Sequence, residues 1–173
     1  MKLCPIILCG GIGKRLWPIS TKNHPKQFIQ LFDGKSLFQK TLMRVSDSLF
    51  EKPIVVSSSI YEHIIRQQAD EVNKKYIFLE EPSSKNTSPS ILLAMQYCAD
   101  RNIDNCLVLP SDHYIPNNKY FLKIMQNAIN DIHRYALTIF GVKPKFSSNK
   151  YGYIKIEKLD KKSYHVSKFI EKP

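Results

Sequence analysis

The sequence has no long apolar run, and its 173 residues include only six glycines and one tryptophan. A membrane-spanning helix needs about 20 consecutive apolar residues, so we expect no membrane association. Met1-Lys2 precedes only a short apolar run and then glycines, which is not the form of a signal peptide. We therefore expect a cytoplasmic protein.

Cysteine is scarce and has no metal-binding spacing. Cys4, Cys9, Cys98 and Cys106 form no Cys-x-x-Cys pair, and three of the four lie in apolar segments. Such cysteines are typical of free, mostly buried thiols in a reducing compartment.

Acidic residues are also few: 15 Asp and Glu stand against 26 Lys and Arg, giving a net charge of +11. This excess suits anionic partners. The basic residues are scattered, however, and no recognition helix, zinc finger or RNA-binding sheet accompanies them. General surface charge is the favoured explanation, and no nucleic-acid partner is expected. The hydrophobic content of 43% and charged content of 24% indicate a soluble globular chain, long enough for one α/β domain.

Three of the six glycines fall within four residues, directly after an apolar run at 6–9. Closely spaced glycines let a backbone turn sharply and direct several N–H groups into one concavity, which favours an anion. Cations follow at once and again about a dozen residues later. The segment therefore suits a polyphosphate, although a tight turn without a ligand stays open; its residues are Gly10, Gly11, Gly13, Lys14, Arg15 and Lys26.

Two common phosphate loops do not fit this segment. A P-loop would need a glycine where Leu8 stands and a hydroxyl side chain where Arg15 stands. The dinucleotide fingerprint would need its third glycine at Leu16. Pro18 and Pro25 also prevent an immediate helix. The glycine cluster predicts a phosphate loop of another kind.

Strand and helix patterns alternate along the chain. Strands are predicted at 6–9, 53–57, 76–79, 106–109 and 136–142, and helices at 36–49, 61–72, 87–99 and 121–132. Two more strands, 151–156 and 164–170, follow without an intervening helix. The pattern predicts an α/β fold with a doubly wound, Rossmann-like, mostly parallel sheet. Ligands of such sheets lie beyond the carboxyl ends of the strands, where we expect the glycine loop to meet Asp112.

Seven short motifs, in order along all 173 residues, resemble the sugar-nucleotide pyrophosphorylases. The Leu-Trp-Pro and Pro-Lys-Gln-Phe forms are similar to the branch that uses mannose 1-phosphate. The motifs are Gly10-Gly11-x-Gly13-x-Arg15-Leu16-Trp17-Pro18-x-Ser20, Pro25-Lys26-Gln27-Phe28, Glu81-Pro82 with Asn86-Thr87-x-Pro89, Leu109-Pro110-Ser111-Asp112-His113, Gly141-x-x-Pro144, Tyr151-Gly152-Tyr153-Ile154 and Phe169-x-Glu171-Lys172-Pro173.

The resemblance implies the nucleotide-diphospho-sugar transferase fold, and transfer of a guanylyl group from GTP to mannose 1-phosphate with Mg2+ as cofactor. Family members are much longer, with a second metal-binding aspartate further on. We therefore expect 1–173 to be the N-terminal part of a single nucleotidyltransferase domain whose C-terminal part is missing. A non-catalytic remnant that folds and binds nucleotide weakly or not at all is the alternative. A homo-oligomer, or a separate chain that supplies the missing half, also stays open.

Residue roles follow from the residue types and the resemblance together. Arg15 and Lys26 are the expected catalytic cations on the triphosphate, and Asp112 the expected Mg2+ ligand, with a turn or cap role as its alternative. The phosphate loop comprises Gly10, Gly11, Gly13 and Lys14. By resemblance, the guanine is expected at Asn86, Thr87 and Pro89, and the sugar phosphate at Gly152, Glu171 and Lys172.

Several structural roles accompany these. Thr87 also suits a helix cap, Trp17 suits packing at the loop base, and His113 suits a hydrogen-bonded structural role. The chain departs from the family at Asn149-Lys150, where Thr-Gly is usual. If that glycine supplies a special backbone angle, Lys150 weakens sugar binding.

Overall fold

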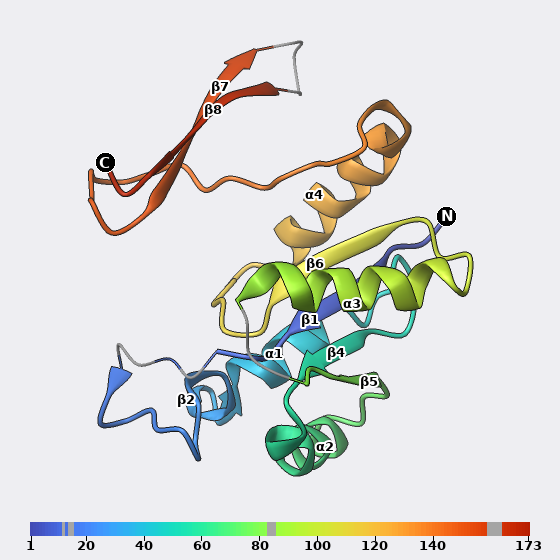
Figure 1. Cartoon of the computed structure of the whole chain (residues 1–173), viewed down its shortest axis with the longest axis vertical. Helices are drawn as coiled ribbons and strands as arrows, with labels where there is room; N and C mark the ends of the chain where they lie inside the picture. Colours follow the sequence, from blue (N-terminus) through green and yellow to red (C-terminus); the bar gives the residue numbers. More distant parts are fainter. Residues whose placement is uncertain (12, 14–15, 83–85, 159–163) are drawn as a thin grey trace. The chain divides into compact units, whose positions relative to one another are not determined.

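A computed structural model describes residues 1–11, 13, 16–82, 86–158 and 164–173. The chain forms two compact units, Met1–Asp131 and Ile132–Pro173. The first unit contains the parallel sheet and its helices, and the second contains an antiparallel hairpin (Figure 1).

The sheet has four parallel strands in the order β5-β4-β1-β6. Their bounds are Cys4–Leu8 for β1, Ile54–Ser57 for β4, Ile77–Glu80 for β5 and Cys106–Pro110 for β6. β1 is central, since Ile6 lies in register with Ile54 on one side and with Val108 on the other. The α/β class and these four predicted strands are confirmed.

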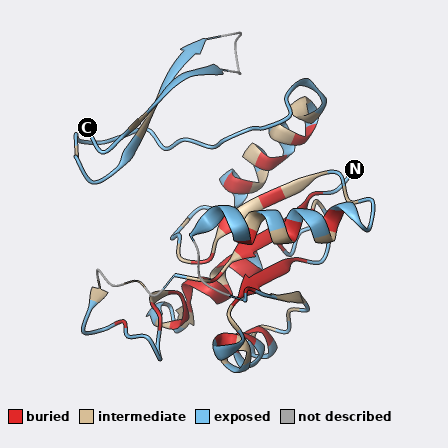
Figure 2. Ribbon diagram, in the orientation of Figure 1, coloured by how far each residue is buried: buried red, intermediate tan, exposed pale blue. Residues whose placement is uncertain are grey.

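Both faces of the sheet are buried, which explains why its strands have almost continuous apolar sequences. On one face, Ile6, Ile54 and Val56 pack with Ala94 and Cys98 of helix α3, Thr87–Ala99. α3 crosses the front of the sheet in Figure 1. On the other face, Ile7 and Val55 are also fully buried, and Figure 2 shows this core as a continuous buried region.

The remaining helices of this unit are α1 (Leu37–Arg44), α2 (Glu62–Glu71) and α4 (Asn118–Asp131). α4 buries Phe121, Met125 and Ile129 along one side, as its apolar spacing predicts. In the described part of the chain, no helix has both the length and the apolar character that crossing a membrane requires.

A capping box at Ser36 begins α1 and joins it to α2. Ser36 Oγ accepts from the Gln39 backbone N–H at 3.1 Å, and Ser36 N–H donates to Gln39 Oε1 at 2.9 Å. Ser36 Oγ also donates to Gln68 Oε1 of α2 at 2.6 Å. All three residues are buried, so these bonds form where no water can replace them.

The four cysteines are free, as expected, and all except the half-buried Cys106 are buried. Burial, with the neighbouring Cys98 thiol adding to the effect, raises the pKa of Cys4 and of Cys106 to about 12. These thiols are therefore protonated at neutral pH and pack as small apolar side chains.

A short antiparallel ribbon in the first unit was not predicted. β2 (Gln30–Phe32) and β3 (Lys35–Ser36) pair around Asp33-Gly34, both of which have positive φ. Strands of three and two residues are too short to show an alternating apolar pattern.

The second unit is the hairpin of β7 (Gly152–Lys158) and β8 (Tyr164–Glu171), in register from Gly152 and Glu171 to Lys158 and Tyr164. Both strands were predicted. The predicted strand at 136–142 is wrong: the segment is not paired with any strand, and Leu137 is 82% and Val142 93% exposed. An apolar sequence becomes a strand only where a neighbouring strand supplies hydrogen bonds.

We expect Ser36→Ala to lower the free energy of unfolding by about 2 kcal/mol, because it removes the cap of α1 and leaves Gln68 Oε1 without this donor. Urea denaturation measures the change. Ser48→Ala is the control, since Ser48 is exposed and its hydroxyl reaches only Asp47 at 3.4 Å. Equal stability of the two variants contradicts a structural role for the capping box.

Candidate active site at the carboxyl ends of the sheet

The loops that follow β1 and β6 lie side by side. Ser111 N–H donates to Leu8 O at 3.1 Å, and Cys9 N–H donates to Val56 O of β4 at 2.8 Å. Gly10 and Asp112 are the next residues along their loops. The predicted meeting of the glycine loop with Asp112 at one edge of the sheet is therefore confirmed.

Lys26 joins these two loops. Its ammonium lies 3.1 Å from Asp112 Oδ2 and 3.2 Å from the Asp112 backbone oxygen. The side chains are 29% and 40% exposed, so solvent screens the pair and its net contribution to stability is at most about 1 kcal/mol. A phosphate can replace Asp112 as the partner of Lys26 at little energetic cost.

Gly13 allows the loop to fold back onto Lys26. Its φ is +72°, and a Cβ at this position would lie 2.5 Å from Lys26 Cβ. Ser20 Oγ donates to Gly13 O at 2.6 Å and fixes the turn. Glycine is required here both for its backbone angle and for the close approach. By contrast, a Cβ on the exposed Gly11 would meet nothing within 4 Å.

Gln27 holds the base of the loop, a role that the sequence did not reveal. Its buried side chain donates from Nε2 to Cys9 O at 3.0 Å, and Ser57 Oγ donates to the same oxygen at 3.3 Å. Gln27 lies inside the Pro25-Lys26-Gln27-Phe28 motif. The motif marked the position, but only the folded chain shows which backbone group the amide reaches.

Glu81 is a buried carboxylate beside the loop. It follows β5 directly, and its Oε1 accepts from Ser90 Oγ of α3 at 2.5 Å. Its Oε2 lies 3.0 Å from the position a Cβ on Gly10 would take. The sequence placed Glu81 in a motif without assigning it a role.

Cys9 lies within this arrangement but is not a nucleophile. Its burial raises the thiol pKa to about 12; the nearby Asp112 charge acts in the same direction, and a bond with Ser111 opposes them. Because the reactive form of cysteine is the thiolate, Cys9 serves as a packing residue at the end of β1.

The predicted base-binding residues lie at the start of α3. Asn86, Thr87 and Pro89 are all exposed. Asn86 occupies the N-cap position with φ 68° and makes no side-chain cap bond, while Thr87 is already the first helical residue. The alternative of a Thr87 cap is therefore wrong, and its side chain faces solvent.

Other predicted residues differ from the expected roles or lie outside the described residues. Lys14 and Arg15 lie outside the described residues. Trp17 is 76% exposed, so its ring is not packed and the predicted packing role is wrong. His113 is also exposed and has no hydrogen bond within the described part of the chain, which contradicts the structural role expected for it.

The predicted sugar-phosphate residues belong to the hairpin unit. Lys172 Nζ lies 3.0 Å from Glu171 Oε1 in an exposed pair, and Lys172 N–H donates to Tyr151 O at 3.2 Å. A Cβ on Gly152 would lie 2.6 Å from the Phe169 ring, so this glycine is explained by the packing of its own hairpin. Lys150 does not have a positive φ, so its backbone does not require the family's usual glycine.

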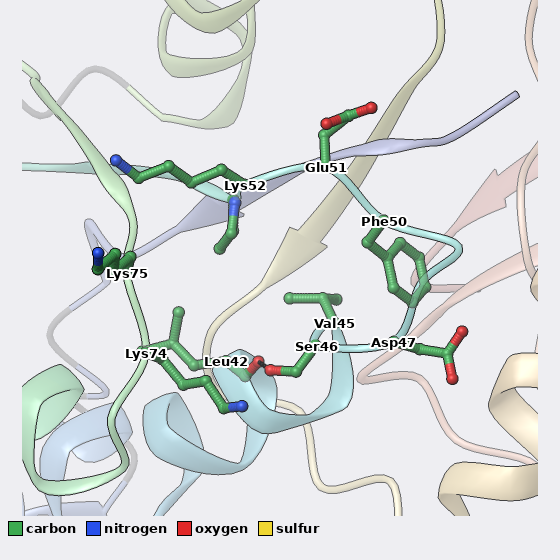
Figure 3. A pocket seen from close by; sticks show the side chains of 10 residues that line it. Leu42, Val45, Ser46, Asp47, Phe50, Glu51, Lys52, Lys74 and Lys75 are labelled. Atoms are coloured by element: carbon green, nitrogen blue, oxygen red, sulfur yellow. Dashed lines mark hydrogen bonds between the residues drawn. The ribbon is translucent and has the colours of Figure 1, made fainter.

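A cavity of about 380 Å3 lies elsewhere in the first unit (Figure 3). Its lining includes Lys52 and Pro53, which precede β4, and Lys74 and Lys75, which precede β5. It is therefore at the amino ends of the strands, the opposite end of the sheet from Asp112, and it takes no part in the candidate site.

The site fits a metal ion held partly by a bound phosphate rather than one enclosed by protein ligands. Within the described residues, no three His, Cys, Asp or Glu side chains gather as a metal-binding group. Asp112 is half-exposed beside Lys26. Mg2+ commonly binds through one or two carboxylates together with substrate phosphates and water, and a single carboxylate at this position suits that mode.

Sequence comparison now decides the family. The sequence profile described as Nucleotidyl transferase matches residues 4–173. The chain belongs to the nucleotidyl transferase family. It is 36% identical to mannose-1-phosphate guanylyltransferase of Salmonella muenchen over 99% of this chain, and 37% identical to the alginate biosynthesis protein AlgA of Pseudomonas syringae pv. tomato over 99%.

Structure comparison agrees with this nucleotidyl transferase assignment. All of the chain superposes, with a TM-score of 0.86 and 28% identity, on a Thermus thermophilus structure named mannose-1-phosphate geranyltransferase, of which it covers 51%. It spans 37% of the Salmonella muenchen relative and 36% of the Pseudomonas protein. The chain thus corresponds to about a third of the length of these two relatives.

We expect Gly13→Ala to lower the free energy of unfolding by about 1–3 kcal/mol, since it places a Cβ at a positive φ and against Lys26. Thermal melting of the ligand-free chain measures this. Gly11→Ala is the matched control, because its Cβ meets nothing, and it should stay within about 0.5 kcal/mol of the parent. Indistinguishable melting of the two variants contradicts the loop geometry.

Proposed function

We propose that this chain is the N-terminal part of a single nucleotidyltransferase domain that transfers a guanylyl group from GTP to mannose 1-phosphate. The products are GDP-mannose and pyrophosphate. The observation that carries the proposal is the Lys26–Asp112 pair, 3.1 Å apart, with Gly13 of the glycine loop packed against Lys26. Further support comes from relatives that bear the name mannose-1-phosphate guanylyltransferase.

The proposed reaction asks for charge stabilisation rather than an activated side chain. An oxygen of the sugar phosphate attacks the α-phosphorus in line, and the bond from that phosphorus to the pyrophosphate oxygen breaks. The attacking phosphate is already ionised at neutral pH, so no general base is needed. Lys26 and the loop N–H groups hold the triphosphate and the charge that develops on it. Lys14 and Arg15 join them in the proposal.

Asp112 is the proposed ligand of Mg2+. When bound, the ion neutralises phosphate charge and orients the oxygens of the triphosphate. Asp112 would then contribute a carboxylate oxygen, and Lys26 would turn from Asp112 to phosphate. Glu171, Lys172 and Gly152 remain the proposed sugar-phosphate residues. We propose a cytoplasmic location, which suits four free cysteines, and no nucleic-acid partner.

Recognition of guanine is assigned to the start of α3 and to Glu81. Guanine presents two adjacent donor groups, N1–H and N2–H2, which a carboxylate can accept together. Glu81 is buried, is held by Ser90 and lies beside Gly10. Asn86, Thr87 and Pro89 would line the same base.

We expect GTP with Mg2+ to raise the melting temperature of the chain, and Lys26→Met to weaken GTP binding at least about tenfold, because a charge-assisted contact is lost. Asp112→Asn should remove the Mg2+-dependent part of the shift. Lys40→Met and Asp33→Asn are matched controls, since they break another exposed ion pair of 3.0 Å. Calorimetric titration supplies the affinities.

Pyrophosphate release from GTP and mannose 1-phosphate separates the enzyme from the remnant. Release that disappears in Asp112→Asn supports catalysis by this chain. A melting shift without release supports the alternative, a remnant that binds nucleotide without turning it over. The absence of both release and shift refutes the assigned site.

Glu81→Gln should reduce the preference for GTP over ATP by about tenfold, because an amide presents a donor where guanine also presents one. The ratio of the two dissociation constants is the measurement. Glu80→Gln, an exposed neighbour of the same charge, should leave this ratio unchanged. An unaltered ratio in Glu81→Gln shows that another group reads the base.

A further inference from the structure

Lys26 lies on a segment whose backbone is held by helix α2. Gln68 Nε2 of α2 donates to Phe28 O at 2.8 Å. The hydroxyl of Tyr61, the residue directly before α2, donates to Lys22 O at 2.9 Å. One of these carbonyls precedes Lys26 in the chain and the other follows it. The backbone that carries the Lys26 side chain is therefore fixed on both sides.

Tyr61 and Gln68 form a rigid support. They are seven residues apart, close to two turns of a helix, so they lie on the same side of α2. Each is only 6% exposed. Gln68 is itself fixed, because its Oε1 accepts from Ser36 Oγ at 2.6 Å and its backbone oxygen accepts from Gln39 Nε2 at 3.2 Å. The support therefore extends from α2 to the start of α1.

The Tyr61 hydroxyl contributes something that aromatic packing does not. The Phe28 ring is 1% exposed, and its centroid lies 5.9 Å from that of Tyr61 and 5.6 Å from that of Phe38. A phenylalanine in place of Tyr61 would pack in the same way. The bond from the hydroxyl to Lys22 O is thus a separate feature, and it lies on the side of Lys26 that packing does not reach.

The turn at residues 21–24, directly before Pro25 and Lys26, depends on this bond. All four of its residues are exposed. Within the turn, Thr21 N–H donates to His24 O at 3.1 Å and His24 N–H donates to Thr21 O at 3.2 Å. Across the described parts of the chain, the bond from Tyr61 is the one hydrogen bond that joins this turn to another segment. Its loss would free the turn and the backbone that leads into Lys26.

We propose that Tyr61 and Gln68 are positioning residues for Lys26. They hold the backbone before and after Lys26, so that only its side chain turns from Asp112 to the triphosphate. A cation on an ordered backbone loses less conformational freedom when it binds its ligand, which strengthens binding. Tyr61 and Gln68 act through Lys26 and do not themselves contact the nucleotide. This inference rests on the proposed function, in which Lys26 binds GTP.

A double-mutant cycle tests whether Tyr61 acts through Lys26. Tyr61→Phe keeps the ring and removes the hydroxyl, so calorimetric titration should show GTP binding with Mg2+ weakened about threefold to tenfold. In a Lys26→Met background the same substitution should have no further effect. Equal weakening in both backgrounds overturns the proposal, as does unchanged affinity in the single variant. Tyr76→Phe is the matched control, because Tyr76 is half-buried before β5, at the opposite end of the sheet.

A second measurement needs no nucleotide. In the ligand-free chain, Tyr61→Phe should lower the 15N order parameters of the Asn23 and Lys26 amides from about 0.85 toward about 0.6, while Tyr76→Phe leaves them unchanged. Unchanged values in Tyr61→Phe overturn the proposal, whether or not GTP binds. A fall in these values in a chain whose parent does not bind GTP confirms the support of the Lys26 backbone and refutes the proposed function instead.

Discussion

The central position of β1 is the constraint on which the first unit depends. With α3 packed on one face, a buried opposite face and a strand on each side, the backbone polar groups of β1 must pair with β4 or β6. Parallel pairing then brings all the carboxyl ends to one side. That is why Gly10, Asp112 and Glu81, which follow three different strands, share one edge of the sheet. The chemistry is concentrated there because the strand direction leaves no other end for it.

The ion pair between Lys26 and Asp112 illustrates how such a site can be ordered without a ligand. A cation and a carboxylate that both serve a charged ligand each need a partner while that ligand is absent. Pairing at 3.1 Å satisfies both at a modest net energy, since both remain partly exposed. The supporting bonds from Gln27, Ser57 and Ser20 are made to backbone oxygens and do not depend on that pair. The hydrogen bonds that hold the loops therefore stay in place when Lys26 and Asp112 change partners.

The sequence was most informative where local pattern and tertiary environment agree. The four parallel strands followed from apolar runs, and the helix start at Ser36 followed from a hydroxyl before a periodic segment. The segment at 136–142 has an equally good strand pattern, yet a pattern cannot supply the neighbouring strand that pairing requires. The roles of Gln27 and Glu81 could not be predicted from the sequence for a related reason. Their roles depend on which distant backbone or side chain the fold brings to them, and spacing along the chain does not contain that information.

Two buried cysteines of the first unit also give the protein an internal reporter. Cys4 and Cys98 are at most 1% exposed in the core between the sheet and α3, and burial raises the pKa of the Cys4 thiol to about 12. An alkylating reagent reaches such thiols only when the sheet separates from α3, so the labelling rate follows the opening of this unit rather than the chemical reactivity of the thiol. The natural sequence thus contains thiols whose labelling rate reports core opening, in a region distinct from the charged residues that we assign to the nucleotide.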